Sequence, residues 1–203
     1  MQISVSFLKS IHDQKTTINL IDNTDANYIH VDVMDGIFVD NKTLSIEECT
    51  DLFSEVNKPL DVHLMVKNPL PYINYFKNLN PSFITIHVEI DECNEMIDLI
   101  KSYGIKVGLA INPETNEQIL DKYFDKVDLI NVMSVHPGKG GQEFMLDSID
   151  KINYIKDNSN LLIEVDGGVN DISRKYLNDV SILVSGSYIC MSDNYQEKIN
   201  SLR

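Results

Sequence analysis

Residues 28–36, with the sequence YIHVDVMDG, are predicted to form a β-strand that ends in a turn. Tyr, Ile and Val favour strands, and Asp35-Gly36 is typical of the turn that follows. Side chains of a strand alternate between its two faces, so His30, Asp32 and Met34 share one face. A strand buried in a parallel sheet is normally apolar on both faces. Burying an imidazole and a carboxylate without partners costs several kcal/mol, so we expect both side chains to bind something.

The rest of the chain alternates between strand-like and helix-like stretches. Strands are predicted in a short run that ends at Ser6 and at residues 28–34, 59–66, 83–87, 106–111, 128–133, 161–165 and 181–184. Helices are predicted at about residues 9–20, 46–56, 69–79 and 94–103, after Asn112-Pro113, at 144–156 and in a tail to Arg203. Strict alternation implies a parallel sheet, and eight repeats favour a closed barrel. We therefore predict the α/β class, as a (β/α)₈ TIM barrel forming a single domain over residues 1–203.

The composition restricts the partners and the location of the chain. It has 31 acidic and 17 basic residues and a net charge of −14, whereas nucleic acids and anionic membranes are bound by basic patches. No apolar run approaches the roughly 18 residues of a membrane span, and no signal peptide is recognised. Three cysteines without a C-x-x-C pair suit a reducing cytoplasm. We therefore expect a cytoplasmic protein without nucleic-acid or membrane partners.

Polar side chains gather at the predicted C-terminal ends of the strands, where barrel enzymes carry their catalytic groups. His30 and Asp32 lie on one strand, His63 on the next, and Asp166 follows the seventh. Two imidazoles and two carboxylates suit one divalent metal ion, with zinc as first choice and iron, manganese or cobalt as alternatives. The same residues could instead be hydrogen-bonded rim side chains without a metal, and their spacing leaves both interpretations open.

The two carboxylates are expected to face each other, because strands 2 and 7 of a closed barrel lie on opposite sides of its mouth. A base on each side of a bound carbon allows inversion of a stereocentre, with a metal stabilising the carbanion between them. Asp166 could instead be an ordinary Asp-Gly-Gly turn residue, and Asp35 is interpreted as structural. His87 and Glu89 could form a supporting pair, although a role for His87 in the core is simpler.

Three glycine-containing turns follow strands 6, 7 and 8: Gly138–Gly141, Gly167-Gly168 and Gly186-Ser187. Glycines expose backbone N–H groups, and the loops after strands 7 and 8 form the usual phosphate site of such barrels. Each turn alone is weak evidence, but together they predict a phosphate pocket.

Four motifs carry a resemblance to a known family: HVDVMDG (30–36), DVHLMV (61–66), HPGKGGQ (136–142) and VDGG (165–168). In this order, and over essentially the full chain, they resemble the ribulose-phosphate 3-epimerases. The resemblance implies a metal-dependent TIM barrel of the pentose phosphate pathway that interconverts D-ribulose 5-phosphate and D-xylulose 5-phosphate through an enediolate. It implies metal ligands at His30, Asp32, His63 and Asp166, with Asp32 and Asp166 as the acid/base pair. It further implies substrate contacts at Ser6, His63, Gly138, Lys139, Gly140, Gly141, Gly167, Gly168, Gly186 and Ser187.

The chain departs from the family pattern at Val5, Ile37, Asp40 and Lys139, which lie in or near the loops around the substrate. A 3-epimerase of a hexulose phosphate such as D-allulose 6-phosphate is therefore an alternative. A non-catalytic phosphosugar-binding barrel would lose one of the four ligands, and a decarboxylase would need a lysine on strand 2 or 3. The apolar residues 37–39 could form a subunit contact or cover the substrate, and we expect a homo-oligomer.

Overall fold

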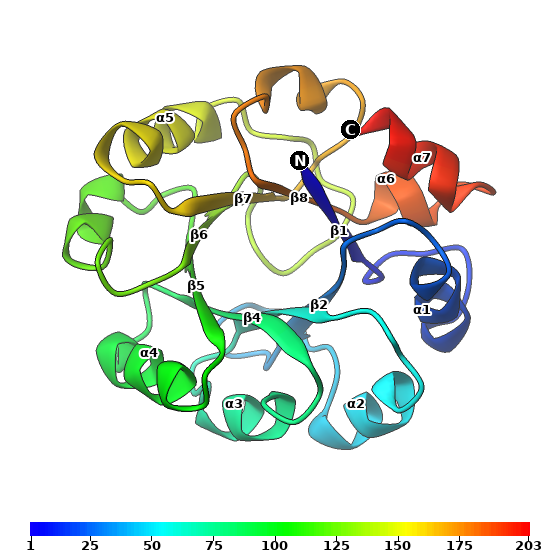
Figure 1. Ribbon diagram of the computed structural model, residues 1–203, viewed down its shortest axis with the longest axis horizontal. Helices are drawn as coiled ribbons and strands as arrows, with labels where there is room; N and C mark the ends of the chain where they lie inside the picture. The colour runs from blue at the N-terminus through cyan, green and yellow to red at the C-terminus, as the bar shows by residue number, and fades with distance from the viewer.

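The computed structural model describes residues 1–46 and 48–203, which contain a closed barrel of eight parallel strands (Figure 1). Each strand pairs with the next along the chain, and the last pairs with the first. The strands are β1 (Gln2–Ser6), β2 (Tyr28–Met34), β3 (Leu60–Met65), β4 (Pro81–His87), β5 (Lys106–Ile111), β6 (Leu129–Met133), β7 (Leu162–Asp166) and β8 (Ile182–Ser185). The predicted (β/α)₈ TIM barrel is confirmed.

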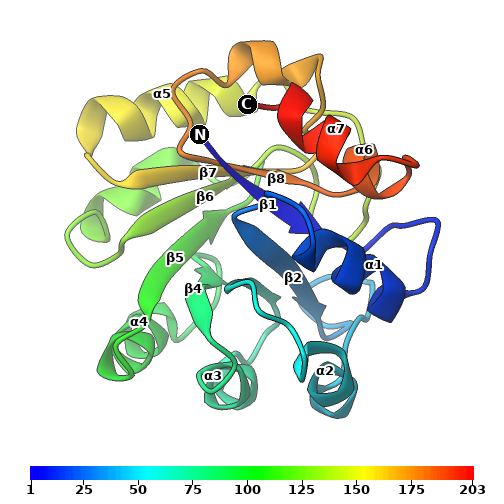
Figure 2. The ribbon, with the colours of Figure 1, turned by 45° about the vertical axis from the view of Figure 1, so that its right-hand side comes forward.

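Helices surround the barrel on its outside (Figures 1 and 2). The α-helices are α1 (Gln14–Asp22), α2 (Ile46–Phe53), α3 (Leu70–Phe76), α4 (Cys93–Ser102), α5 (Ser148–Asn158), α6 (Ser187–Cys190) and α7 (Tyr195–Ser201). Two 3₁₀-helices, η1 (Glu117–Lys122) and η2 (Ser173–Tyr176), follow β5 and β7. Among the described residues, no helix has the length and apolar character needed to cross a membrane.

Two predicted helices start later than expected. The helix predicted from residue 9 begins at Gln14, because the Asp13 side chain accepts the Thr16 N–H and caps the helix there. The helix predicted from residue 144 begins at Ser148, because the Met145 N–H donates to the Ser134 carbonyl and holds the chain against the end of β6. Both loops therefore lie along the C-terminal rim of the barrel.

A helix follows β5 and β7 as the predicted alternation requires, but in both places it is a 3₁₀-helix. These connections carry η1, with six residues, and η2, with four. Such short segments commonly close with the tighter 3₁₀ hydrogen bonds.

The apolar faces of the strands fix which side chains point into the barrel. Val31 and Val33 of β2 are fully buried in the same hydrophobic cluster as Ile18 and Ile21 of α1. Each buried aliphatic side chain contributes about 1.5–3 kcal/mol. A slip of one residue would exchange the two faces, so this burial also holds the polar side chains of β2 inside the barrel.

Below the rim, the barrel interior carries a polar layer, whereas branched apolar side chains usually fill this space. Gly108 makes room for part of it, because a Cβ there would lie only 2.0 Å from Thr85 Oγ1. Both carboxylate oxygens of Glu164 lack a hydrogen-bond partner among the described residues. The fully buried residues of this layer are Ser4, Asp61, Thr85, Asn131 and Glu164.

Candidate metal centre and active site

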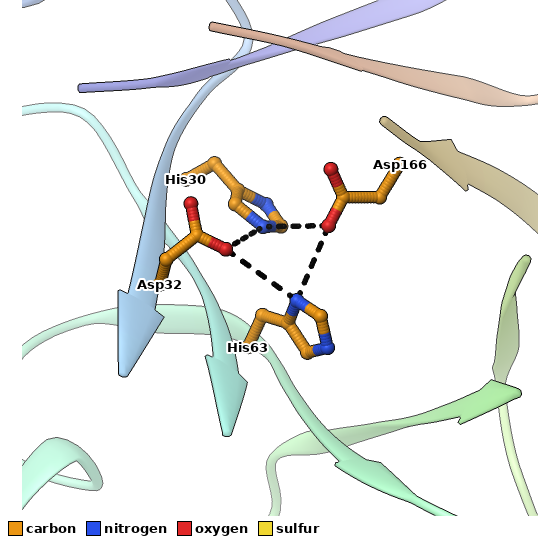
Figure 3. Close-up of side chains that lie close together, drawn as sticks. All are labelled: His30, Asp32, His63 and Asp166. Atoms are coloured by element: carbon orange, nitrogen blue, oxygen red, sulfur yellow. Dashed lines mark ion pairs between the residues drawn. The ribbon is translucent and has the colours of Figure 1, made fainter. Parts of the chain in front are cut away.

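Four side chains from three strands converge at the C-terminal end of the barrel (Figure 3). His30 and Asp32 belong to β2, His63 to β3 and Asp166 to β7. One nitrogen or oxygen of each lies within 4.8 Å of those of the other three. Strand register explains why the side chains of β2 and β3 converge, because Asp32 of β2 is the direct register partner of His63 of β3.

The imidazoles and carboxylates alternate around a ring. His30 Nε2 lies 3.4 Å from Asp32 Oδ1 and 3.6 Å from Asp166 Oδ2. His63 Nδ1 lies 3.6 Å and 3.2 Å from the same two oxygens. Figure 3 shows the carboxylates on opposite sides of the imidazole pair. The structure thus places an acidic side chain on each side of a shared centre.

The spacing of the ring fits a divalent cation. Ligand atoms about 2.0–2.1 Å from a tetrahedral zinc ion lie roughly 3.3–3.4 Å from one another, close to the 3.2 Å to 3.6 Å separations in the ring. His30 Nε2 and His63 Nδ1 are buried and have no hydrogen-bond partner within the described chain. Buried polar atoms rarely lack a partner, and a cation would satisfy both nitrogens at once. The residues therefore fit a metal ion.

The second nitrogen of each imidazole contacts a neighbouring side chain. His30 Nδ1 lies 2.8 Å from Asp61 Oδ2, which also accepts the Ser4 hydroxyl at 2.7 Å. His63 Nε2 lies 2.9 Å from His87 Nε2. These contacts leave His30 Nε2 and His63 Nδ1 to face the carboxylates. Metal-binding histidines are commonly oriented by such contacts on the opposite nitrogen.

His87 continues this support on the side of His63 that faces away from the ring. Its Nδ1 lies 3.1 Å from Glu89 Oε2, and Glu89 Oε1 accepts the Thr115 hydroxyl at 2.6 Å. Burial lowers the pKa of His87 to about 4 despite the opposing hydrogen bond with Glu89, so the ring is neutral at pH 7. His87 is thus fully buried, as a role in the core requires. It also contacts Glu89, as a supporting pair requires, and His63.

The electrostatics of the ring favour positive charge at its centre. Burial opposes a charge on His30, but attraction by Asp61 and Asp32 outweighs it and raises the His30 pKa well above its ordinary value. Burial likewise opposes ionisation of Asp32 and Asp166. Electrostatic attraction by the two imidazoles, whose nitrogens lie 3.2 Å to 3.6 Å away, prevails there, and the pKa of each carboxyl is lowered. Both carboxylates are therefore ionised at neutral pH, as cation binding requires.

Asp61 allows a test of the support behind the ring, because it contacts His30 from the side away from Asp32 and Asp166. Asp61→Asn keeps the size of the side chain and removes its charge. We expect the dissociation constant for zinc to rise about 10- to 100-fold, since His30 becomes a weaker base with a less fixed orientation. Competition with a chromophoric chelator measures this constant. An unchanged constant in the folded variant would contradict the assignment.

A pocket with about 570 Å³ of empty volume, open mouth included, adjoins the ring. The pocket brings together the three glycine turns that lie far apart in the sequence. The predicted site residues that line it are Ser6, Asp32, Gly138, Lys139, Gly140, Gly141, Asp166, Gly167, Gly168, Gly186 and Ser187.

Four of these glycines, Gly138, Gly141, Gly167 and Gly168, adopt positive-φ backbone conformations that favour glycine. Gly168 has φ +64°, and a Cβ there would lie 2.4 Å from the Phe144 backbone nitrogen. Gly141 has φ +80°, and the amides of Gly140 and Gly141 donate to no acceptor within the described chain. Successive backbone N–H groups that remain free form concavities suited to anions.

Other predicted residues have distinct positions. The Ser6 hydroxyl donates to Asp32 Oδ2 at 2.7 Å, next to the ring. His63 was also predicted to contact substrate, but it is fully buried, does not line the pocket, and directs its nitrogens at protein groups. Asp35 accepts the backbone N–H groups of Ile37, Phe38 and Lys67, which is a structural role.

Sequence reasoning did not identify Lys9, which lines the pocket, or Glu164, which lies in the buried layer beneath the ring. The pairing of Asp61 with His30 was also missed, although Asp61 shares the strand face of His63. That alternation is the one signal in the sequence that could have indicated it.

Comparison with known proteins identifies the family. The model of the ribulose-phosphate 3 epimerase family matches residues 2–190. The chain belongs to this family. It is 40% identical to the ribulose-phosphate 3-epimerase of Helicobacter pylori strain J99 over 191 residues, which cover 89% of this chain and 87% of that protein. It is 36% identical to the ribulose-phosphate 3-epimerase of Bacillus subtilis strain 168 over 193 residues, covering 88% and 86%. The resemblance seen in the motifs is confirmed.

Solved structures of lower identity share the architecture of this member of the ribulose-phosphate 3-epimerase family. 3-Hexulose-6-phosphate synthase from Salmonella typhimurium has a TM-score of 0.74 at 13% identity and covers 100% of this chain and 96% of its own. KGPDC from Streptococcus mutans has a TM-score of 0.73 at 11% identity, covering 99% and 94%. At such identities the likeness shows the fold alone.

Proposed function

We propose that the protein epimerises C3 of a ketose phosphate and converts D-ribulose 5-phosphate to D-xylulose 5-phosphate. The observation that carries this proposal is the pair Asp32 and Asp166, which flank one centre from opposite sides and line the same pocket. Membership of the ribulose-phosphate 3-epimerase family supports the reaction class and the pentulose phosphate substrate.

His30, Asp32, His63 and Asp166 would hold one divalent ion, for which we propose zinc, while iron, manganese and cobalt also suit these ligands. When bound, the ion supplies positive charge that stabilises the negative charge developing on the substrate during proton removal. The two carboxylates would supply two of its ligand atoms, and their pKa values lie below the ordinary range. Ligand and acid/base roles of these residues are therefore coupled.

The acid/base chemistry needs one proton to leave C3 and another to arrive on the opposite face. One of Asp32 and Asp166 takes the proton from C3, and the other returns a proton from the far side. The direction of the reaction decides which carboxylate acts as the base. The Ser6 hydroxyl, which donates to Asp32 Oδ2, leaves Asp32 Oδ1 facing the ring and fixes the orientation of this carboxylate. Positioned general acids and bases of this kind accelerate reactions about 10²–10⁴-fold.

The three glycine turns would bind the phosphate of a small sugar substrate. The free N–H groups of Gly140 and Gly141 and the tight left-handed turn at Gly168, which has no room for a side chain, support this role. The loop over residues 137–141 also contacts the loop after β2, because Asn41 Nδ2 donates to the Gly138 carbonyl. We propose that these two loops exclude water from the reacting carbon.

Product analysis by NMR tests this function. The purified protein with zinc should convert D-ribulose 5-phosphate to D-xylulose 5-phosphate faster than it converts D-allulose 6-phosphate at equal concentration. Faster conversion of the hexulose phosphate would replace the proposed substrate and keep the reaction. Turnover of neither compound, with zinc bound at one ion per chain, would reject the proposal in favour of a phosphosugar-binding barrel.

The oligomeric state and the cellular location of the protein are predicted from the sequence. Ile37 is 74% exposed at the tip of the loop after β2, which supports a subunit contact in a homo-oligomer. We also keep the expectation of a cytoplasmic protein.

A further inference from the structure

Lys9 lies in the loop after β1 and crosses the glycine loop after β6. A Cβ added to Gly140 would lie 3.2 Å from Lys9 Cβ, and one added to Gly141 would lie 2.6 Å from Lys9 Nζ. The side chain therefore runs along these two glycines and places its ammonium group beside Gly141. Lys9 also lines the pocket that contains Asp32 and Asp166.

The ammonium group of Lys9 has no ion-pair or hydrogen-bond partner within residues 1–46 and 48–203. Lys139, on the glycine loop itself, lines the same pocket and likewise has no ion-pair partner there. Outside the pocket, Lys67, Lys151 and Lys156 lie within 3.4 Å of a carboxylate. Other lysines, such as Lys15, also have no ion pair among the described residues, so it is the position beside the pocket that distinguishes Lys9 and Lys139. Two lysines without a carboxylate partner thus border one pocket, in a protein with 31 acidic and 17 basic residues.

We infer that Lys9 is a specificity-determining residue that pairs with the phosphate dianion of the substrate, with Lys139 adding positive charge from the facing loop. This inference rests on the proposed function. Backbone N–H groups alone supply partial charge, whereas an ammonium group forms a charge-assisted contact with a phosphate oxygen. Positive charge at the mouth of the pocket would also attract an anionic substrate toward a molecule with a net charge of −14.

Lys9 could instead act only by packing its aliphatic stem on the glycine loop. Lys9→Met separates the two roles, because methionine keeps an unbranched apolar stem and removes the charge. Lys9→Arg restores the charge. Lys15→Met is the matched control, since Lys15 is an exposed lysine of α1 that does not line the pocket.

The experiment measures KM and kcat for D-ribulose 5-phosphate, and the dissociation constant of inorganic phosphate by calorimetry, for the zinc-loaded proteins. In Lys9→Met we expect KM and the phosphate dissociation constant each to rise at least about tenfold, with kcat falling less than threefold. Lys9→Arg should restore both constants to within about threefold, and Lys15→Met should match the wild type. Lys9→Gln replaces Lys9→Met if the latter does not fold.

Unchanged KM and unchanged phosphate binding in Lys9→Met would overturn the inference. A fall in kcat alone would also overturn it, because that result would indicate a loop-packing role. If the wild type binds inorganic phosphate in a Lys9-dependent manner but epimerises neither ketose phosphate, the anion site stands and the proposed function fails. Failure of the inference about Lys9 and failure of the proposed function are therefore distinguishable.

Discussion

Asp166→Asn should lower the rate of epimerisation at least about 10³-fold while leaving the barrel folded. Asp166 would serve both as a proton carrier for one face of C3 and as a ligand of the cation. The amide cannot carry the proton, and its uncharged oxygen binds a cation more weakly. Loss of a general acid or base alone costs about 10²–10⁴-fold. Asp166 is 14% exposed at the end of β7, so its neutral isostere disturbs little packing. NMR detection of D-xylulose 5-phosphate measures the rate, and circular dichroism reports the fold.

Asp171→Asn provides the matched control, because Asp171 is an exposed carboxylate in the loop after β7 and does not line the pocket. Its rate should stay within about twofold of the wild type. Turnover above a tenth of the wild-type rate in folded Asp166→Asn would contradict the two-carboxylate mechanism.

His63→Ala should abolish the stabilisation that zinc gives to the wild-type protein. A ligand that binds only the folded state at about 1,000 times its dissociation constant adds about 4 kcal/mol to the free energy of unfolding. The variant keeps three of the four ring residues but leaves His87 Nε2 without its buried partner. We therefore expect a lower stability without metal and little further gain on adding zinc. Thermal unfolding with zinc and with a chelator measures both effects.

His12→Ala controls for zinc that binds exposed imidazoles, because His12 lies at the surface before α1. The zinc-dependent rise in melting temperature should persist in His12→Ala and in the wild type. An equal rise in His63→Ala would show that zinc stabilises the protein from another place and would contradict the assignment of the ring.

Alternation along single strands made much of the site predictable. The two apolar valines of β2 must face the helices, so His30 and Asp32 must face the barrel interior. The same alternation in β3 directs the His63 side chain into the barrel. Closure of the barrel then brings β7 to the side opposite β2. These relations depend only on local periodicity and strand count, and both can be read from the residues.

Contacts set by side-chain direction and loop path were not predictable in this way. Lys9 was expected in a helix, but Asp13 caps α1 five residues later than predicted, and Lys9 is left in a loop across Gly140. The Glu164 carboxylate lies close to Asp61 and His30, from β3 and β2, and only closure of the barrel brings these three side chains together. Such pairs depend on tertiary placement, which a single sequence does not specify.

Hydrogen exchange at C3 tests most directly whether two separate carboxylates act on one carbon. D-Ribulose 5-phosphate converted by the wild-type protein in D₂O should give D-xylulose 5-phosphate with one deuterium at C3 and none at C1, from the first turnovers onward. This is expected because the group that returns the proton differs from the group that removed it and carries a proton from solvent. Retention of the original hydrogen at C3, or deuterium at C1, would contradict the account.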